Sequence, residues 1–150
     1  MSDTRPRPID SGDILRLLLV EDDPDDVHVI RRALRTVSIP VTMTHAENGR
    51  VALELLTAPA GAAAFDMVLL DLNMPVLDGW TVLKTLRADR RFDTLPICVL
   101  TTLSEPDVLA EARHLGANAA LSKGTTFEAT CDIAQSIVDL WTGAMFHDAA

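Results

Sequence analysis

Cysteine is scarce in this sequence, and a long hydrophobic run is missing altogether. The chain of 150 residues has two cysteines, Cys98 and Cys131, which are too few for a disulfide framework and lie in no motif typical of a zinc site. No apolar stretch approaches the ~20 residues of a membrane-spanning helix. Residues 1–10 contain prolines and aspartates where a secretory signal has its apolar centre. We therefore predict a protein of the reducing cytoplasm.

Positive charge is also in deficit. The chain has 13 Lys and Arg against 22 Asp and Glu, a formal net charge of −9, so its surface repels nucleic-acid phosphates and anionic lipids. We therefore expect no nucleic acid and no membrane among its partners. The length favours one domain, predicted over residues 14–146. Alternating prolines predict a flexible segment over residues 1–13, and residues 147–150 a short C-terminal tail.

Two kinds of segment alternate along the rest of the chain. Short apolar runs, typical of strands, occupy residues 15–20, 41–46, 67–72, 97–100 and 119–121. Between and after them lie five stretches with helical spacing of apolar residues. These are marked by Val27, Ile30, Leu34 and Val37; by Val51, Leu55 and Leu56; by Trp80, Leu83 and Leu86; by Val108, Ala112 and Leu115; and by residues 126–144. The alternation predicts an α/β fold with a parallel sheet, helices on both faces, and a ligand site beyond the carboxyl ends of the strands.

Acidic residues follow the first and third predicted strands. Five carboxylates occur within residues 21–26, and Asp71 ends the third strand. A solvated loop and a helix N-terminus would explain some of them, Asp25 and Asp26 above all. Glu21 and Asp22, however, directly follow an apolar strand, so we expect two neighbouring strands to bring them close to Asp71. Carboxylates that repel one another, with no histidine or thiolate beside them, predict a Mg²⁺ site.

A hydroxyl and an ammonium group follow the next two strands. Thr101 ends the fourth strand and Lys123 follows the fifth, so both are expected at the same edge as the acids. A carboxylate nucleophile, a divalent cation, a hydroxyl donor and a lysine together predict phosphoryl transfer onto Asp71.

The residues at the strand ends resemble the receiver domain of response regulators in two-component signalling. The resemblance covers about residues 14–142. It rests on Leu18-Leu19-Val20-Glu21-Asp22, Leu70-Asp71-Leu72-Asn73-Met74-Pro75, Asp78-Gly79, Leu100-Thr101-Thr102, Gly116-Ala117 and Ser122-Lys123. It implies a flavodoxin-like, doubly wound five-stranded parallel sheet of order 2-1-3-4-5 with five helices.

The resemblance also implies a role for each matched residue. In that family a sensor histidine kinase donates the phosphoryl group in a Mg²⁺-dependent reaction, and the domain is a signalling domain rather than an enzyme. Asp71 matches the phosphoacceptor, Asp22 the direct metal ligand, Glu21 its acidic neighbour, Asn73 the residue whose main-chain carbonyl joins the metal, Thr101 the hydroxyl that turns toward the phosphate, and Lys123 the lysine that pairs with it.

Three further stretches resemble the single-domain regulators that serve bacterial phytochrome kinases. They are residues 20–27, 100–102 and 137–141. This similarity implies a bacteriophytochrome as the kinase partner.

Two positions depart from the family pattern. Gly124 replaces the usual proline after the lysine, so we expect a trans Lys123–Gly124 bond and a differently shaped loop. Ala120 replaces the usual aromatic residue, and the chain contains no tyrosine. We therefore expect the phosphorylated state to be transmitted by another route.

The last predicted helix has two apolar stripes. One contains Phe127, Cys131, Ala134, Val138, Trp141 and Met145, and the other contains Ile133, Ile137, Leu140 and Ala144. Because one sheet face covers one stripe, the second predicts a homodimer through this helix.

Two other functions stay open at this stage. The same scaffold could serve as an interaction module that is never phosphorylated, which the complete set of matched residues argues against. An aspartate-nucleophile phosphatase shares the chemistry but needs Asp-x-Asp after its first strand. Here Asp71-Leu72-Asn73 matches that motif only in part, and it lies at the third strand.

Overall fold

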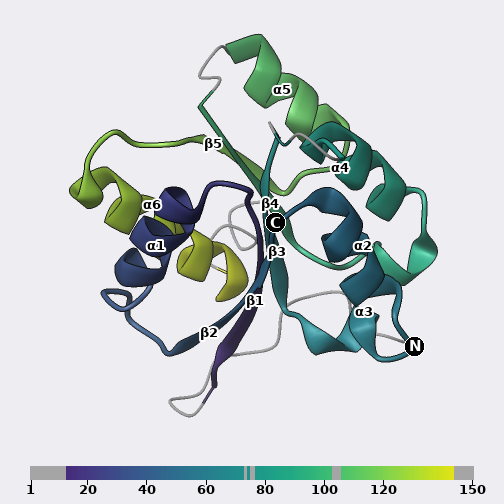
Figure 1. Ribbon diagram of the computed structural model, residues 1–150, viewed down its shortest axis with the longest axis horizontal. Helices are drawn as coiled ribbons and strands as arrows, with labels where there is room; N and C mark the ends of the chain where they lie inside the picture. The colour runs from purple at the N-terminus through teal and green to yellow at the C-terminus, as the bar shows by residue number, and fades with distance from the viewer. Residues whose placement is uncertain (1–12, 73, 75–76, 103–105, 144–150) are drawn as a thin grey trace.

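The computed structural model describes residues 13–72, 74, 77–102 and 106–143, and Figure 1 shows them as one sheet between two layers of helices. The sheet is parallel with the strand order β2-β1-β3-β4-β5, which confirms the predicted fold class. The strands are β1 (Leu15–Val20), β2 (Val41–Ala46), β3 (Met67–Asp71), β4 (Ile97–Thr101) and β5 (Ala119–Ser122).

The helices divide unequally between the two faces of the sheet. One face carries α1 (Pro24–Ala33) and α6 (Phe127–Trp141), as Figure 1 shows. The other carries α2 (Gly49–Thr57), α3 (Gly61–Ala64), α4 (Gly79–Arg87) and α5 (Pro106–His114), with a short 3₁₀ helix, η1 (Arg90–Phe92), after α4.

Alternation along the central strands builds one apolar core on each face. Leu17 and Leu19 of β1 pack in the cluster that contains α1 and α6 residues, whereas Leu18 and Val20 pack in the cluster beneath the other helices. Every residue of β3 is buried, as expected for a parallel strand covered on both faces.

Acidic residues also start the helices at the carboxyl edge of the sheet. The Asp23 carboxylate accepts a hydrogen bond of 2.9 Å from the Asp25 N–H, and Pro24 occupies the first helical position of α1. Asp78 caps α4 in the same way by accepting from the Thr81 N–H at 2.8 Å. The chain therefore passes from β1 to α1 within three residues, Glu21, Asp22 and Asp23.

The helices differ from the predicted set in three places. The one-turn helix α3 is additional, so the described residues contain six α-helices where five were expected. Helix α1 ends at Ala33, before Val37, and the Ala33 carbonyl accepts from the Thr36 hydroxyl at 2.7 Å and from the Thr36 N–H at 3.0 Å. Helix α6 ends at Trp141 because Gly143 adopts a φ of 89°, a left-handed conformation that stops the helix.

The second apolar stripe of α6 is not exposed, so this part of the prediction is wrong. Ile137 and Leu140 are 1% and 3% exposed and share one cluster with Val138 and Trp141. Helix α1 packs beside α6, and its Val27 and Ile30 belong to the same cluster. The apolar surface on which the homodimer was predicted is therefore covered within the chain.

Some predicted features lie outside the described residues. Residues 1–12 and 144–150, which include most of the predicted flexible segment and the tail, are among them, as are Ala144 and Met145 of the two stripes. Within the described ranges, no helix is both long enough and apolar enough to span a bilayer.

Arg87, at the end of α4, fastens that helix to three other segments. Its Nη1 donates to the Phe92 carbonyl at 2.6 Å, and its Nε donates to the Gly116 carbonyl at 2.9 Å. Its Nη2 donates at 2.9 Å to both the Leu95 carbonyl and the Asn118 side chain. Burial lowers the pKa of Arg87, although Asp93 opposes this effect. One guanidinium thus joins α4, η1 and the turn before β5.

Arg87→Met should lower the free energy of unfolding by about 2–4 kcal/mol, because it keeps much of the side-chain stem but removes four hydrogen bonds from a charged donor. Equilibrium unfolding in urea measures this loss. Arg91→Met is the matched control, since Arg91 is exposed and pairs only locally with Asp89. Equal losses in the two variants would contradict the role of Arg87.

Candidate metal and phosphoryl site

Three carboxylates converge at the carboxyl ends of β1 and β3. Val20 lies beside Leu70 in the parallel register, so the next residues, Glu21 and Asp71, leave the two strands side by side. Glu21, Asp22 and Asp71 each place one carboxylate oxygen within 4.8 Å of the others. Glu21 and Asp71 are 1% and 5% exposed, whereas Asp22 faces solvent. The expected acidic cluster is therefore present in the geometry.

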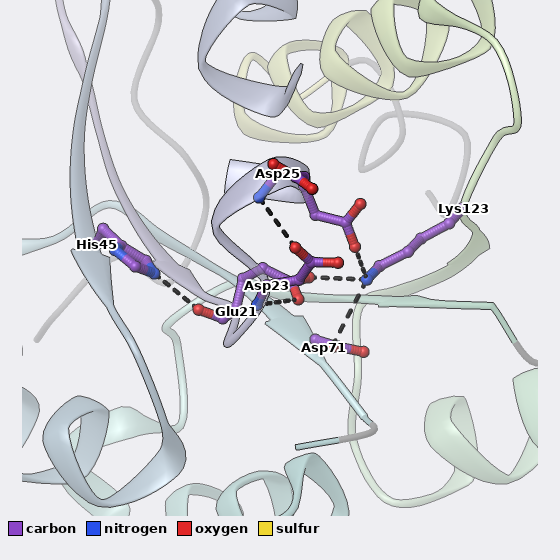
Figure 2. Close-up of polar contacts among 7 residues, drawn as sticks. Glu21, Asp23, Asp25, His45, Asp71 and Lys123 are labelled. Atoms are coloured by element: carbon purple, nitrogen blue, oxygen red, sulfur yellow. Dashed lines mark hydrogen bonds and ion pairs between the residues drawn. The ribbon is translucent and has the colours of Figure 1, made fainter. Parts of the chain in front are cut away.

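The Lys123 ammonium group lies among these acids (Figure 2). Its Nζ is 2.8 Å from Glu21 Oε2 and 3.6 Å from Asp71 Oδ2. It is also 2.8 Å from Asp26 Oδ2 on α1. The Lys123 N–H donates to the Thr101 carbonyl at 2.7 Å, which fixes the chain after β5 against the end of β4. Four elements therefore position one cation.

The Glu21 backbone and side chain are held from two directions. Glu21 Oε1 accepts from the Asp23 N–H at 3.2 Å, and the Glu21 carbonyl accepts from His45 Nε2 at 2.7 Å (Figure 2). His45 was not among the residues predicted for the site. Its place at the carboxyl end of β2, next to β1 in the sheet, is the signal that could have identified it.

Burial and charge act in opposite directions on the two central groups. The pKa of Glu21 is raised from 4.5 to about 7: burial is the largest cause, the hydrogen bond from Lys123 opposes it, and the nearby Asp71 charge adds to it. Burial lowers the pKa of Lys123, but hydrogen bonds with Asp26 and Glu21 outweigh this effect and leave it above its usual value. The lysine therefore stays charged across the physiological range.

The structure also places the other predicted residues. Thr101 is fully buried at the end of β4, on the strand next to Asp71. Asn73, predicted to offer its main-chain carbonyl, lies outside the described residues. Gly79 begins α4 directly beneath Asp71: a Cβ there would overlap the Asp71 carbonyl oxygen and lie 2.6 Å from the Leu72 Cα. The backbone that presents Asp71 thus depends on a glycine at this position.

A cavity of about 260 Å³ opens beside Lys123, between α1 and the start of α6. Asp26, Lys123 and Gly124 line the end nearest the acids, and Phe127 lies on the far side with the Arg32 guanidinium 4.6 Å from its ring centre. Every peptide bond within the described residues is trans, which confirms the expectation for Lys123–Gly124. A Cβ at Gly124 would overlap the Ala129 side chain, so α6 starts close against this loop.

The donor set suits a hard divalent cation. Glu21, Asp22 and Asp71 offer only carboxylate oxygens, and two of the three side chains are buried. Oxygen ligands in small number, with room for water on the exposed Asp22 side, match the coordination habits of such ions. These residues could therefore hold a divalent metal.

The fold and the site together define a class of protein. The family model for the response regulator receiver domain matches residues 17–135, so the chain belongs to that family. The chain is 32% identical over 143 residues to the probable methanogenesis regulatory protein FilR2 of Methanothrix harundinacea, covering 90% of this chain and 92% of that protein. It is 27% identical over 137 residues to response regulator Rcp1 of Synechocystis sp., covering 89% and 93%.

Two solved structures agree with this assignment. The phosphorylated cyanobacterial phytochrome response regulator RcpA superposes with a TM-score of 0.77 at 27% identity, covering 88% of this chain and 96% of that one. The Mn²⁺-bound form of Rcp1 gives a TM-score of 0.73 at 26% identity, covering 85% and 94%. The predicted resemblance to receiver domains of phytochrome response regulators is thus confirmed.

The raised pKa of Glu21 predicts that the metal-free protein loses stability as the pH rises. The folded protein holds the Glu21 proton more tightly than the unfolded chain does, so this contribution is complete below about pH 4.5 and is lost by about pH 7. Urea unfolding with a chelator at pH 5 and pH 7.5 should show a loss of the order of 1–2 kcal/mol from this group.

Glu21→Gln should remove that part of the pH dependence, and Glu54→Gln, at an exposed position of α2, should keep it. Identical pH profiles for wild type and Glu21→Gln would show that Glu21 titrates normally.

Proposed function

We propose that this protein is a response regulator whose Asp71 accepts a phosphoryl group from the phosphohistidine of a sensor histidine kinase, with Mg²⁺ as the cofactor. One observation carries the proposal. A buried aspartate at a strand end lies 3.6 Å from a lysine ammonium and close to two further carboxylates. Asp71 thus has a cation beside it and a metal-binding donor set within reach.

The reaction needs a carboxylate oxygen of Asp71 to attack phosphorus. A new O–P bond forms as the bond between phosphorus and the histidine nitrogen breaks, and the imidazole leaves as a neutral ring that carries its proton on the other nitrogen. Lys123 and the Thr101 hydroxyl donate to the phosphoryl oxygens as charge develops on them. A Mg²⁺ ion held by the carboxylates of Glu21, Asp22 and Asp71 would supply further positive charge for those oxygens.

The metal set that we propose contains Glu21, Asp22, Asp71 and the main-chain carbonyl of Asn73. Asp22 is the exposed member and Asp71 the member shared with the phosphoryl group. The acid cluster supports this set, and the Mn²⁺-bound form of Rcp1 supports a divalent ion at such a site. Mg²⁺ fits because it takes few protein ligands and keeps several waters.

We infer that the kinase partner is a bacteriophytochrome. The support is the likeness to RcpA, a cyanobacterial phytochrome response regulator. Phosphorylation would change the charge at one edge of the sheet and thereby alter the binding of partners. On this proposal the protein signals without turning over a substrate, binds no nucleic acid or membrane, and acts in the cytoplasm.

The two alternative functions predict different results. An interaction module that is never phosphorylated would show no binding in a Mg²⁺ titration. A phosphatase would turn over a generic phosphate ester. The buried Lys123 contacts favour the receiver function over the unphosphorylated module, because an ammonium held beside Asp71 serves phosphoryl transfer to that residue.

Asp71→Asn should keep the fold and abolish labelling by acetyl phosphate in the presence of Mg²⁺, because the amide is a poor nucleophile. A phosphate-affinity gel measures the labelled fraction. Asp132→Asn, an exposed aspartate of α6, is the control and should label normally, and a chelator should stop labelling of wild type. Labelling that survives in Asp71→Asn would place the nucleophile elsewhere.

The homodimer also stays a prediction. Its original argument, an exposed stripe on α6, no longer holds, since Ile137 and Leu140 are buried. Sedimentation equilibrium at micromolar concentration should give the mass of two chains if the dimer forms, and a mass near 16.3 kDa would exclude it.

A further inference from the structure

Asp26 shares the Lys123 ammonium with the residues of the proposed site. Lys123 Nζ lies as close to Asp26 Oδ2 as to Glu21 Oε2, at 2.8 Å, and 3.6 Å from Asp71 Oδ2. From the sequence, Asp26 is expected in a solvated loop or at the start of a helix. The structure gives it a second role, since its carboxylate holds the cation that Asp71 needs.

The geometry of α1 keeps Asp26 in this position. Asp23 caps the helix by accepting from the Asp25 N–H, and Pro24 occupies the first helical position. These two features fix the first turn of α1. The Asp26 side chain is 39% exposed and the Lys123 side chain 13%. Asp26 therefore meets the ammonium from the outer side and lines the cavity beside it.

A phosphoryl group on Asp71 would add another acceptor for the hydrogen bonds of the Lys123 ammonium. The hydrogen bonds that Lys123 makes in the absence of phosphate go to Glu21 and Asp26, and the contact with Asp71 is longer. To donate to phosphoryl oxygens the ammonium must turn toward Asp71, and each charge-assisted bond that it leaves opposes that movement.

We propose that Asp26 is a positioning residue that competes with the phosphoryl group for Lys123 and so slows phosphorylation of Asp71. This inference rests on the proposed function. Asp26 touches neither Asp71 nor the metal-binding oxygens in the contacts described, and it acts through the lysine alone. Its removal leaves Lys123 paired with Glu21 and with Asp71, which is itself the reacting carboxylate.

The test compares initial rates of phosphorylation by acetyl phosphate with saturating Mg²⁺. Asp26→Asn keeps the shape of the side chain and removes its charge, and the rate should rise about three- to fivefold, the size expected for a partly exposed ion pair. Asp25→Asn removes the same charge from the neighbouring exposed residue and should stay close to wild type. A damaged fold would lower the rate, so the predicted gain is distinct from a structural defect.

A second arm tests whether the effect passes through Lys123. In a Lys123→Met background, Asp26→Asn should change the rate no more than Asp25→Asn does, because the competed group is gone. Asp26→Glu keeps a carboxylate within reach of the ammonium and should restore the wild-type rate. If Asp26→Asn does not fold, Asp26→Ala serves in its place.

The outcomes separate this inference from the proposed function. If wild type is labelled on Asp71 and Asp26→Asn matches Asp25→Asn, loses rate, or keeps its gain without Lys123, the competition is overturned and the proposed function stands. If wild type is not labelled, or Asp71→Asn is labelled equally, the proposed function fails and this inference fails with it.

Discussion

The pairing of one ammonium group with three carboxylates is the interaction on which the site depends. Glu21 and Asp71 are almost fully removed from water, and two such charges side by side would repel each other strongly without a cation. Lys123 supplies that cation, and it lies more than 100 residues from Glu21 along the chain. Charge balance at this edge therefore requires the sheet to be assembled correctly.

The parallel topology makes this balance possible. All five strands point the same way, so the residues at the ends of β1, β3 and β5 emerge at one edge. The order β2-β1-β3-β4-β5 places β1 and β3, the strands that lead to the acids, next to each other. Lys123 reaches across β4, where the Thr101 carbonyl holds its main chain. The buried strands thus contribute to the chemistry by fixing where their last residues leave the sheet.

The sequence was most informative where a pattern has one physical interpretation. Strand positions followed from short apolar runs, and the acid cluster followed from carboxylates directly after two of those runs. The contact between Asp26 and Lys123 could not be predicted, because it depends on the exact turn between β1 and α1. The position of His45 likewise depends on the β1–β2 register.

The exposure of α6 was misjudged for a related reason. The spacing of the two apolar stripes gives no information about a neighbouring helix, and α1 packs beside α6 in the same cluster. The end of α1 before Val37 is a similar case, since apolar periodicity does not report local contacts such as that of the Thr36 hydroxyl with the Ala33 carbonyl.

Arg87 fastens α4 to its neighbours, but α5 has few comparable contacts. Arg87 joins α4 and η1 to the turn before β5, whereas α5 has a single fully buried residue, Ala112, with Val108 and Leu109 only partly covered. Local opening is least costly where few apolar contacts are lost. We therefore expect the amides of α5 to exchange with solvent sooner than those of the strands beside it, and this helix to be the part of the molecule that can rearrange while the sheet stays intact.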